Sequence, residues 1–135
     1  MVKNKGFTLT EIIIVILIIG VLVTLAVTQY ASYKETTLDK EAKANLKLII
    51  AAEKIYKMET SLYYASGTTQ PDAITNINTN LRLLLSTATN RNWNYLTTAT
   101  AGTSCCAQST RNGGDARTFR MRHSENDPVS GSTCP

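Results

Sequence analysis

The sequence contains few of the residues that most enzymes and metal proteins use. It has one histidine, one tryptophan and three cysteines in 135 residues. The single histidine, His123, has no evident nucleophile partner, and the histidine and cysteines do not follow a zinc-type spacing. The spacing of Asp115, Glu125 and Asp127 matches no calcium loop. We therefore expect no metal and no cofactor, and we predict that the protein is not an enzyme.

Charge is absent from one long stretch. No charged residue occurs from Ile12 to Val27, and almost every residue there is apolar. From Phe7 to Val27 the chain would form a helix of about 31 Å, which is enough to cross a bilayer. Lys3 and Lys5 precede this stretch, and the carboxylate of Glu11 lies just inside its edge. Because a charge costs roughly 2.5–3.5 kcal/mol at the centre of a bilayer and less near its surface, we expect Glu11 to have a function.

The first residues of the chain resemble the amino terminus of a known family. The run Lys3-Asn4-Lys5-Gly6-Phe7-Thr8-Leu9-Thr10-Glu11 and the apolar stretch after it are similar to type IV prepilins and to the related type II secretion pseudopilins. That family has a short basic leader, a glycine at the cleavage site, and Phe-Thr-Leu-x-Glu before an apolar helix. The resemblance implies cleavage between Gly6 and Phe7, and N-methylation of Phe7. It also implies that Glu11 pairs with the Phe7 amine of its own or the next subunit.

The resemblance further implies how such a subunit is used. It would be inserted into the bacterial inner membrane with its amino terminus in the cytoplasm. It would then join a cell-surface or periplasmic filament of identical or related subunits. Its partners would be a prepilin peptidase and N-methyltransferase, an assembly platform, an ATPase and the membrane. Thr28 departs from the family, because many members have proline before the residues that correspond to Gln29-Tyr30.

Other functions are open at this point. One alternative is a pseudopilin of a type II secretion system. An alternative from another class is a secreted binding domain with a cleavable signal peptide and a mature start near Val27. A third is a membrane-anchored enzyme, which the missing catalytic residues disfavour. Nucleic-acid binding is not expected, because the net charge of +4 is modest and falls to +2 if Lys3 and Lys5 are removed.

An amphipathic helix is predicted to follow the apolar stretch. No proline or glycine occurs from Tyr30 to Tyr63. Apolar residues recur there at spacings of three and four, as in a helix with one buried face; they are Leu38, Ala42, Leu46, Ile49 and Ile50. Joined to the apolar stretch, this segment gives one helix of about 54 residues. The carboxyl-terminal part of the chain must then cover its buried face.

The composition changes near Ser66 and Gly67, where we expect a turn. The segment after it is rich in threonine, serine and asparagine. Apolar residues interrupt it, which favours short ordered elements over a disordered linker. We predict a short helix over Leu81–Leu85, with Asn78 or Thr79 near its cap.

Strands are predicted beyond this helix. The run Trp93–Thr97 alternates as a strand does, and the run Asn112–Asp115 is typical of a hairpin turn. This turn would join strands over residues 103–111 and 117–123 into a small antiparallel sheet. Alternate residues of the second strand would share one face: Phe119, Met121 and His123. The predicted fold is α+β and pilin-like. Its long amino-terminal helix, transmembrane in the first half and amphipathic in the second, packs against the small antiparallel sheet.

Four parts of the chain follow from these patterns. We expect a leader peptide over residues 1–6, a transmembrane and assembly helix over 7–28, an amphipathic continuation over 29–64, and a globular part over 65–135. Three aromatic residues are predicted to lie in the core: Trp93, Tyr95 and Phe119. Four arginines near the hairpin are interpreted as a solvated sheet face or as contacts between subunits: Arg111, Arg117, Arg120 and Arg122.

All three cysteines, Cys105, Cys106 and Cys134, lie in the last third of the chain. Late, clustered cysteines in a chain with an export segment indicate an oxidising compartment. Either Cys106 or Cys105 is able to pair with Cys134. Because neighbouring residues of a strand face opposite sides, only one of them suits a given bridge. A bridge between Cys105 and Cys106 themselves would be strained. Many pilins have a carboxyl-terminal disulfide around a surface loop, and the resemblance implies one here.

Overall fold

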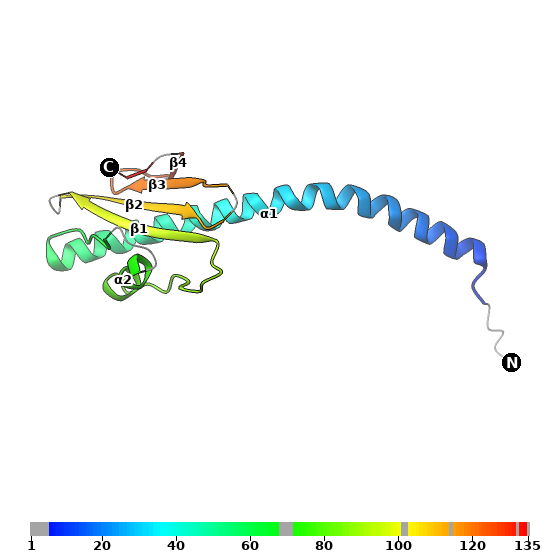
Figure 1. The fold of residues 1–135 in the computed structure, drawn as a ribbon, viewed down its shortest axis with the longest axis horizontal. Coiled ribbons are helices and arrows are strands. Elements are labelled where there is room, and N and C mark those ends of the chain that lie inside the picture. Colours follow the sequence, from blue (N-terminus) through cyan, green and yellow to red (C-terminus); the bar gives the residue numbers. More distant parts are fainter. Residues whose placement is uncertain (1–5, 68–71, 101–102, 114, 132, 135) are drawn as a thin grey trace. The chain divides into compact units, whose positions relative to one another are not determined.

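The computed structural model describes residues 6–67, 72–100, 103–113, 115–131 and 133–134. The chain divides into two compact units, Met1–Thr37 and Leu38–Pro135. Its elements in chain order are helix α1 over Leu9–Thr60, helix α2 over Asp72–Asn80, and strands β1 over Trp93–Thr100, β2 over Ser104–Arg111, β3 over Thr118–Arg122 and β4 over Val129–Ser130 (Figure 1). The predicted α+β fold, with a long helix packed against a small antiparallel sheet, is confirmed.

The amphipathic half of α1 has the predicted buried face. In the second unit, Ala42, Leu46, Ile49 and Ile50 are buried, and Leu38 is half-buried. These residues recur every three or four positions, so their side chains lie on one side of the helix. The lysines between them stay exposed. The helix therefore gives one apolar face to the sheet and one charged face to solvent.

Helix α1 ends at Thr60, slightly before the predicted end near Tyr63. The reason is Ser61, which has a left-handed backbone conformation with a φ of 66°. Its N–H donates to the Lys57 carbonyl at 2.8 Å and closes the last turn. The chain then passes beside the helix, because the N–H of Tyr64 donates to the Glu53 carboxylate at 2.9 Å.

The sheet is antiparallel, with the strand order β1-β2-β3-β4. The strands predicted over Trp93–Thr97, residues 103–111 and residues 117–123 are confirmed as β1, β2 and β3. Strand β1 extends further, to Thr100, while β2 and β3 are slightly shorter than predicted. The predicted hairpin turn joins β2 to β3. Gly113 in this turn has a φ of 83°, which a residue without a side chain adopts readily; Gly114 lies outside the described residues. Strand β4 is only two residues long, and no pattern in the sequence predicts it.

One predicted element is wrong. The sequence predicted a short helix over Leu81–Leu85, whereas the helix observed, α2, precedes these residues and ends at Asn80. The helix cannot continue because Arg82 takes a left-handed conformation with a φ of 54°. Asn78 is not a helix cap. Its side-chain amide instead binds the segment that follows the helix. The amide oxygen accepts from the Leu85 N–H at 2.9 Å, and the amide nitrogen donates to the Leu85 carbonyl at 2.8 Å.

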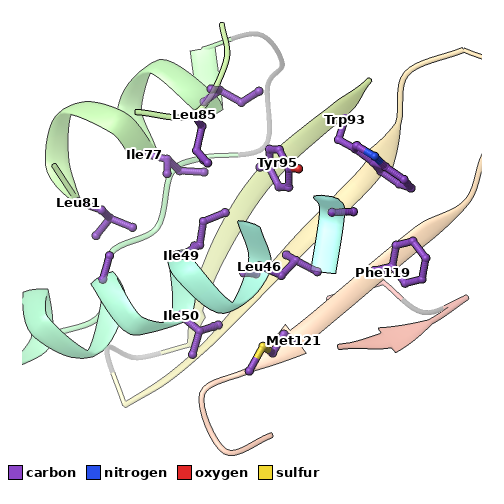
Figure 2. Packing of buried hydrophobic residues seen from close by; sticks show 14 of the residues in the cluster. Leu46, Ile49, Ile50, Ile77, Leu81, Leu85, Trp93, Tyr95, Phe119 and Met121 are labelled. Atoms are coloured by element: carbon purple, nitrogen blue, oxygen red, sulfur yellow. The ribbon is translucent and has the colours of Figure 1, made fainter. Parts of the chain in front are cut away.

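The core of the second unit lies between α1, α2 and the inner face of the sheet (Figure 2). The three aromatic residues predicted for it, Trp93, Tyr95 and Phe119, are 1–3% exposed. The polar groups of Trp93 and Tyr95 each form a hydrogen bond with a residue of α1. The Trp93 indole N–H donates to the Leu38 carbonyl at 2.9 Å, and the Tyr95 hydroxyl accepts from the Asn45 amide at 2.9 Å. These two bonds fix the register between α1 and β1 in addition to apolar packing.

Candidate functional site

The residues predicted for processing and assembly lie at the start of α1. Gly6 and Phe7 precede the helix, and Glu11 is in its first turn. The Phe7 side chain is 78% exposed, and no atom lies within 4 Å of the position that a Cβ on Gly6 would take. The other predicted leader residues, 1–5, lie outside the described residues. No described part of the chain therefore covers the predicted cleavage site.

Thr8 and Glu11 form a local hydrogen-bonded unit. The Glu11 carboxylate accepts from the Thr8 N–H at 2.8 Å and from the Thr8 hydroxyl at 2.7 Å, while the Glu11 N–H donates to the Thr8 hydroxyl oxygen at 3.3 Å. This is a capping box, in which the residue before the helix and the third residue of the helix satisfy each other's free N–H groups. It explains why the helix begins at Leu9.

Sequence reasoning missed this local role of Glu11, although its signal was readable. A threonine followed three residues later by glutamate before an apolar run is the known pattern of a capping box. The predicted pairing of Glu11 with the amine of Phe7 involves a group that exists only after cleavage, so it stays a prediction. Glu11 thus has one partner in the structure and a second, different partner in the prediction.

The first unit presents an apolar helix surface on all sides. Every large apolar side chain from Ile12 to Val27 is between 47% and 66% exposed. An 18-residue window of α1 has a mean hydropathy of 2.9, and none of it is buried inside the structure. Of the described helices, α1 alone is long and apolar enough to cross a membrane. A surface of this kind needs lipid or another protein chain as its surroundings.

The one side-chain hydroxyl inside this apolar segment, that of Thr24, forms a hydrogen bond within the helix. The Thr24 hydroxyl donates to the Val21 carbonyl at 2.7 Å, so it presents no unsatisfied donor to an apolar environment. Gly20, one helical turn before it, has open space around the position of a Cβ. The segment from Ile12 to Val27, which follows the capping box, therefore offers an apolar surface for contacts.

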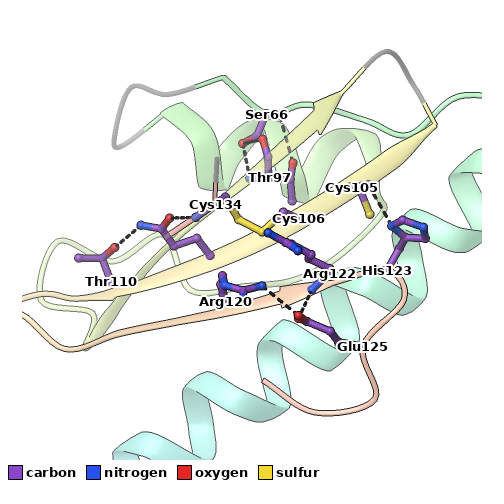
Figure 3. Close-up of a disulfide and its surroundings, with 11 residues drawn as sticks. Ser66, Thr97, Cys105, Cys106, Thr110, Arg120, Arg122, His123, Glu125 and Cys134 are labelled. Atoms are coloured by element: carbon purple, nitrogen blue, oxygen red, sulfur yellow. Dashed lines mark hydrogen bonds and ion pairs between the residues drawn. A yellow bond between two sulfur atoms is a disulfide. The ribbon is translucent and has the colours of Figure 1, made fainter. Parts of the chain in front are cut away.

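The structure joins Cys106 to Cys134, one of the two pairings that the sequence left open (Figure 3). The two residues are 28 positions apart in the sequence. The bridge ties the end of the chain to the middle of the sheet, and the Cys134 N–H donates to the Gln108 side chain at 2.9 Å. Because Cys105 and Cys106 are neighbours on β2, they face opposite sides, which is why only Cys106 meets Cys134.

Cys105 is a free, buried thiol on the core side of the sheet. Burial, with a smaller contribution from the nearby Glu53, raises the pKa of this thiol to about 12. It is therefore protonated at neutral pH, and a protonated buried thiol is a poor nucleophile and a poor metal ligand. We assign Cys105 to packing.

The acidic residues considered for calcium are engaged with cations at separate places. Asp127 accepts from the Lys47 ammonium at 2.6 Å, Asp115 pairs with Arg117 at 2.7 Å, and Glu125 binds Arg120. Arg117 also makes two contacts with Asp39 of α1, at 2.8 and 2.9 Å. Within the described residues there is no group of three histidine, cysteine or acidic side chains that is able to hold a metal ion.

The chain matches known proteins over its amino-terminal part and over about half of its length. The family described as Prokaryotic N-terminal methylation motif matches residues 1–27. The chain is 38% identical over 61 residues to type IV major pilin protein PilA of Myxococcus xanthus, which is 45% of this chain and 28% of that protein. It is also 38% identical over 61 residues to type II secretion system core protein G of Pseudomonas aeruginosa, or 45% of this chain and 43% of the relative.

A third relative is type II secretion system core protein G of Klebsiella pneumoniae, 36% identical over 63 residues, which is 47% of this chain and 45% of the relative. The chain thus spans less than half the length of the curated relatives it matches. No solved structure matches the chain. The methylation motif and these relatives confirm the resemblance to type IV prepilins and type II secretion pseudopilins that the first residues of the sequence indicate.

Proposed function

We propose that this protein is a structural subunit of a type IV pilus-like filament, which polymerises through its amino-terminal apolar helix. The observation that carries the proposal is the combination of the methylation motif with a helix surface that no described residue of the chain covers. The apolar side chains of residues 12–27 are about half exposed or more. Packing of such helices against one another in a filament core would remove this surface from lipid and from water.

The proposal includes a sequence of processing steps. The chain is inserted in the bacterial inner membrane with Lys3 and Lys5 in the cytoplasm, as positive charges beside an apolar segment favour. A prepilin peptidase removes residues 1–6 and methylates the new amine of Phe7. An assembly platform and an ATPase then move the subunit from the bilayer into the filament. Residues 7–28 serve as the membrane span before assembly.

The capping box suggests how Glu11 is tolerated before assembly. In the single chain both hydrogen bonds to its carboxylate come from Thr8, so the charge is partly satisfied without any partner chain. In the filament the cationic amine of Phe7 from a neighbouring subunit would add an ion pair. Because this pair forms in surroundings of low dielectric, it would be sensitive to geometry and would favour one axial position between subunits.

A second candidate is a pseudopilin of a type II secretion system. The identity to the two core proteins G, 38% and 36%, favours it about as much as the identity to the major pilin favours a surface pilus. Both candidates share cleavage, methylation and polymerisation, and they differ in where the filament lies. Deletion of the gene separates them: loss of surface filaments indicates a pilus, and loss of protein secretion indicates a pseudopilus.

The first test of the proposal is the amino-terminal sequence and intact mass of the mature protein from bacterial membranes that contain a prepilin peptidase. We expect a chain that starts at methylated Phe7. The variant Gly6→Val should keep its leader, because a bulky residue does not fit the cleavage site. Gly20→Val is a matched control inside the helix that follows the cleavage site, since its Cβ also meets open space, and it should be processed normally. A mature start near Val27, or an intact Met1, contradicts the proposal.

A further inference from the structure

A polar pocket of about 280 Å³ lies at one end of the sheet. Three strands contribute to it, together with the residues that follow β3. Its polar side chains are hydroxyls, one guanidinium and one imidazole, and none of the residues that line it is acidic: Thr98, Thr100, Ser104, Arg122, His123 and Ser124. The remaining lining residues are Cys105 and Cys106, so the disulfide of Cys106 forms part of its wall.

The strand register places the pocket on the face of the sheet that looks away from the core. Thr98 of β1 is directly opposite Cys106 of β2, and Cys106 is directly opposite Arg122 of β3. Residues that are directly opposite in antiparallel strands project from the same face. Thr98 and Arg122 therefore lie on either side of Cys106 on the outer face. Figure 3 shows Arg122 beside the disulfide between Cys106 and Cys134.

Arg122 differs from the other arginines of the sheet in its partners. Glu125 follows Arg122 closely in the chain, but its Oε1 contacts the guanidinium of Arg120 at 2.9 Å and its Oε2 accepts from the backbone N–H of Arg122 at 2.8 Å. Arg117 is bound to Asp39. Among the described residues the guanidinium of Arg122 makes no hydrogen bond and no ion pair, although its charge contributes to lowering the pKa of Glu125. It is exposed beside the pocket, where its N–H donors are accessible to a ligand.

The imidazole of His123 is turned toward the core side at the edge of this pocket. Its Nδ1 atom accepts from the Cys105 N–H at 3.3 Å, and its ring lies 5.2 Å from the ring of Tyr63, which packs against the core. The charged donor on the outer face is therefore Arg122, and the hydroxyls of the strands lie beside it.

We propose that this pocket binds a phosphate-type oxyanion. The planar guanidinium of Arg122 would make paired, charge-assisted hydrogen bonds to two oxygens of the anion. The hydroxyls of Thr98, Ser104 and Ser124 would donate to the others. The volume is sufficient for one phosphate group and a few waters. The same chemistry suits free phosphate, a phosphate monoester and a phosphodiester. The proposal does not depend on polymerisation.

The test is a titration of the full chain in uncharged detergent micelles, followed by amide NMR. Inorganic phosphate is added at constant ionic strength, with chloride as the reference anion. We expect saturable shifts of the amides of Ser104, Arg122 and Ser124. Arg122→Gln should weaken binding about ten-fold or more, because it removes the charged donor. Arg82→Gln removes the same charge from an exposed site elsewhere and should change binding less than about two-fold.

Two further ligands identify the source of the anion. Methyl phosphate represents a monoester and dimethyl phosphate represents a diester, as in a nucleic acid, a lipid headgroup or a surface polymer. Binding of either one that is lost in Arg122→Gln supports the proposal and names the ligand type. Shifts that equal those from chloride at the same ionic strength overturn it. So does a phosphate affinity that is unchanged in Arg122→Gln while circular dichroism shows the variant folded.

Discussion

At the scale of single residues, Glu53 stands out among the described residues as a charged side chain that is completely buried. Its Oε2 accepts from the Tyr64 N–H at 2.9 Å. Its Oε1 makes no hydrogen bond to any described residue. Burial raises the pKa of this carboxyl from 4.5 to about 7, and the hydrogen bond from Tyr64 and the nearby Thr97 side chain offset only part of that rise.

The raised pKa makes stability depend on pH. Between 4.5 and about 7 the folded chain holds a proton at Glu53 that the unfolded chain has lost. Since the folded state then binds more protons, stability falls as the pH rises through this window. We expect the free energy of unfolding to fall by on the order of 2–3 kcal/mol from about pH 5 to about pH 8 because of this one group. The groups that face it, Tyr63, Tyr64 and Cys105, have raised pKa values and stay neutral there.

The variant Glu53→Gln tests this prediction. The amide keeps an acceptor for the Tyr64 N–H but carries no charge, so this part of the pH dependence should disappear and the variant should be the more stable one at pH 8. Guanidinium denaturation followed by Trp93 fluorescence measures both. Glu59→Gln is the matched control, because Glu59 is an exposed carboxylate of the same helix. A Glu53→Gln protein with the same slope against pH as the parent contradicts the prediction.

The sequence allowed part of this residue-scale description and not the rest. The sequence predicts that three aromatic residues lie in the core, because large aromatic side chains are usually buried and these alternate along predicted strands. They are Trp93, Tyr95 and Phe119. The burial of Glu53 was not predicted, since its position in the sequence alone carries no sign of burial. Its burial results from the chain after Ser61 passing over it, which is a tertiary effect.

At the scale of elements, the disulfide has the largest expected effect on stability. It closes a loop of 28 residues, from the middle of β2 to the end of the chain. In the chain-entropy account a cross-link of this span stabilises the folded state by about 3.6 kcal/mol. The double variant Cys106→Ala with Cys134→Ala should lose about this much free energy of unfolding in guanidinium denaturation.

Cys105→Ala is the control for the loss of a sulfur atom from the same strand. It removes a buried thiol but no cross-link, so it should cost about 1 kcal/mol through the small cavity that it leaves. Under reducing conditions the parent protein should approach the double variant, whereas Cys105→Ala in oxidising buffer should not. Equal losses in the two variants would mean that packing rather than the cross-link stabilises this part of the sheet.

The elements themselves were predictable where one local pattern dominated. The amphipathic half of the long helix, which lacks proline and glycine, and the hairpin with Asn112–Asp115 both had such patterns and were confirmed. The α2 region had two competing patterns. The density of leucine predicts a helix at Leu81–Leu85. However, Ala73, Ile74 and Ile77 have the helical spacing and are buried, whereas Leu84 is 99% exposed. The left-handed Arg82 that ends the helix has no signature in the sequence.

At the scale of the whole molecule, the expected role of Glu11 divides into two parts that mutations separate. Glutamine is able to replace glutamate in a capping box, so Glu11→Gln keeps the bond to Thr8 and removes the charge. Glu11→Ala removes both. If pairing with the Phe7 amine positions the subunits, both variants should be processed normally and neither should form filaments, as electron microscopy and a pelleting assay of sheared filaments would show.

The outcome that contradicts the pairing is clear. Filaments of Glu11→Gln in normal amounts, together with none from Glu11→Ala, would assign Glu11 to the helix cap alone. Normal filaments from both variants would remove Glu11 from assembly. An exposed glutamate of the second unit, Glu41, provides a control that should assemble when changed to glutamine.

The candidate site was predictable from the sequence to an unequal degree. Gly6, Phe7 and Glu11 were singled out because a charge beside a long apolar run is costly and because their order matches a family motif. The capping box and the pocket around Arg122 were not anticipated. The first was a readable local pattern, while the second depends on strand register, which brings Thr98, Cys106 and Arg122 together across three strands.

The segment that follows α1 protects an edge of the sheet against aggregation between chains. In the strand order β1-β2-β3-β4, β1 is an edge strand of eight residues. Midway along it, the Thr97 N–H donates to the Ser66 hydroxyl at 2.9 Å and the Thr97 carbonyl accepts from the Ser66 N–H at 3.1 Å. An edge with these groups occupied is a poor template for a foreign strand. In the proposed filament, this protected edge would disfavour amyloid-like extension of the sheet between crowded chains and would leave their apolar helices as the surfaces of association.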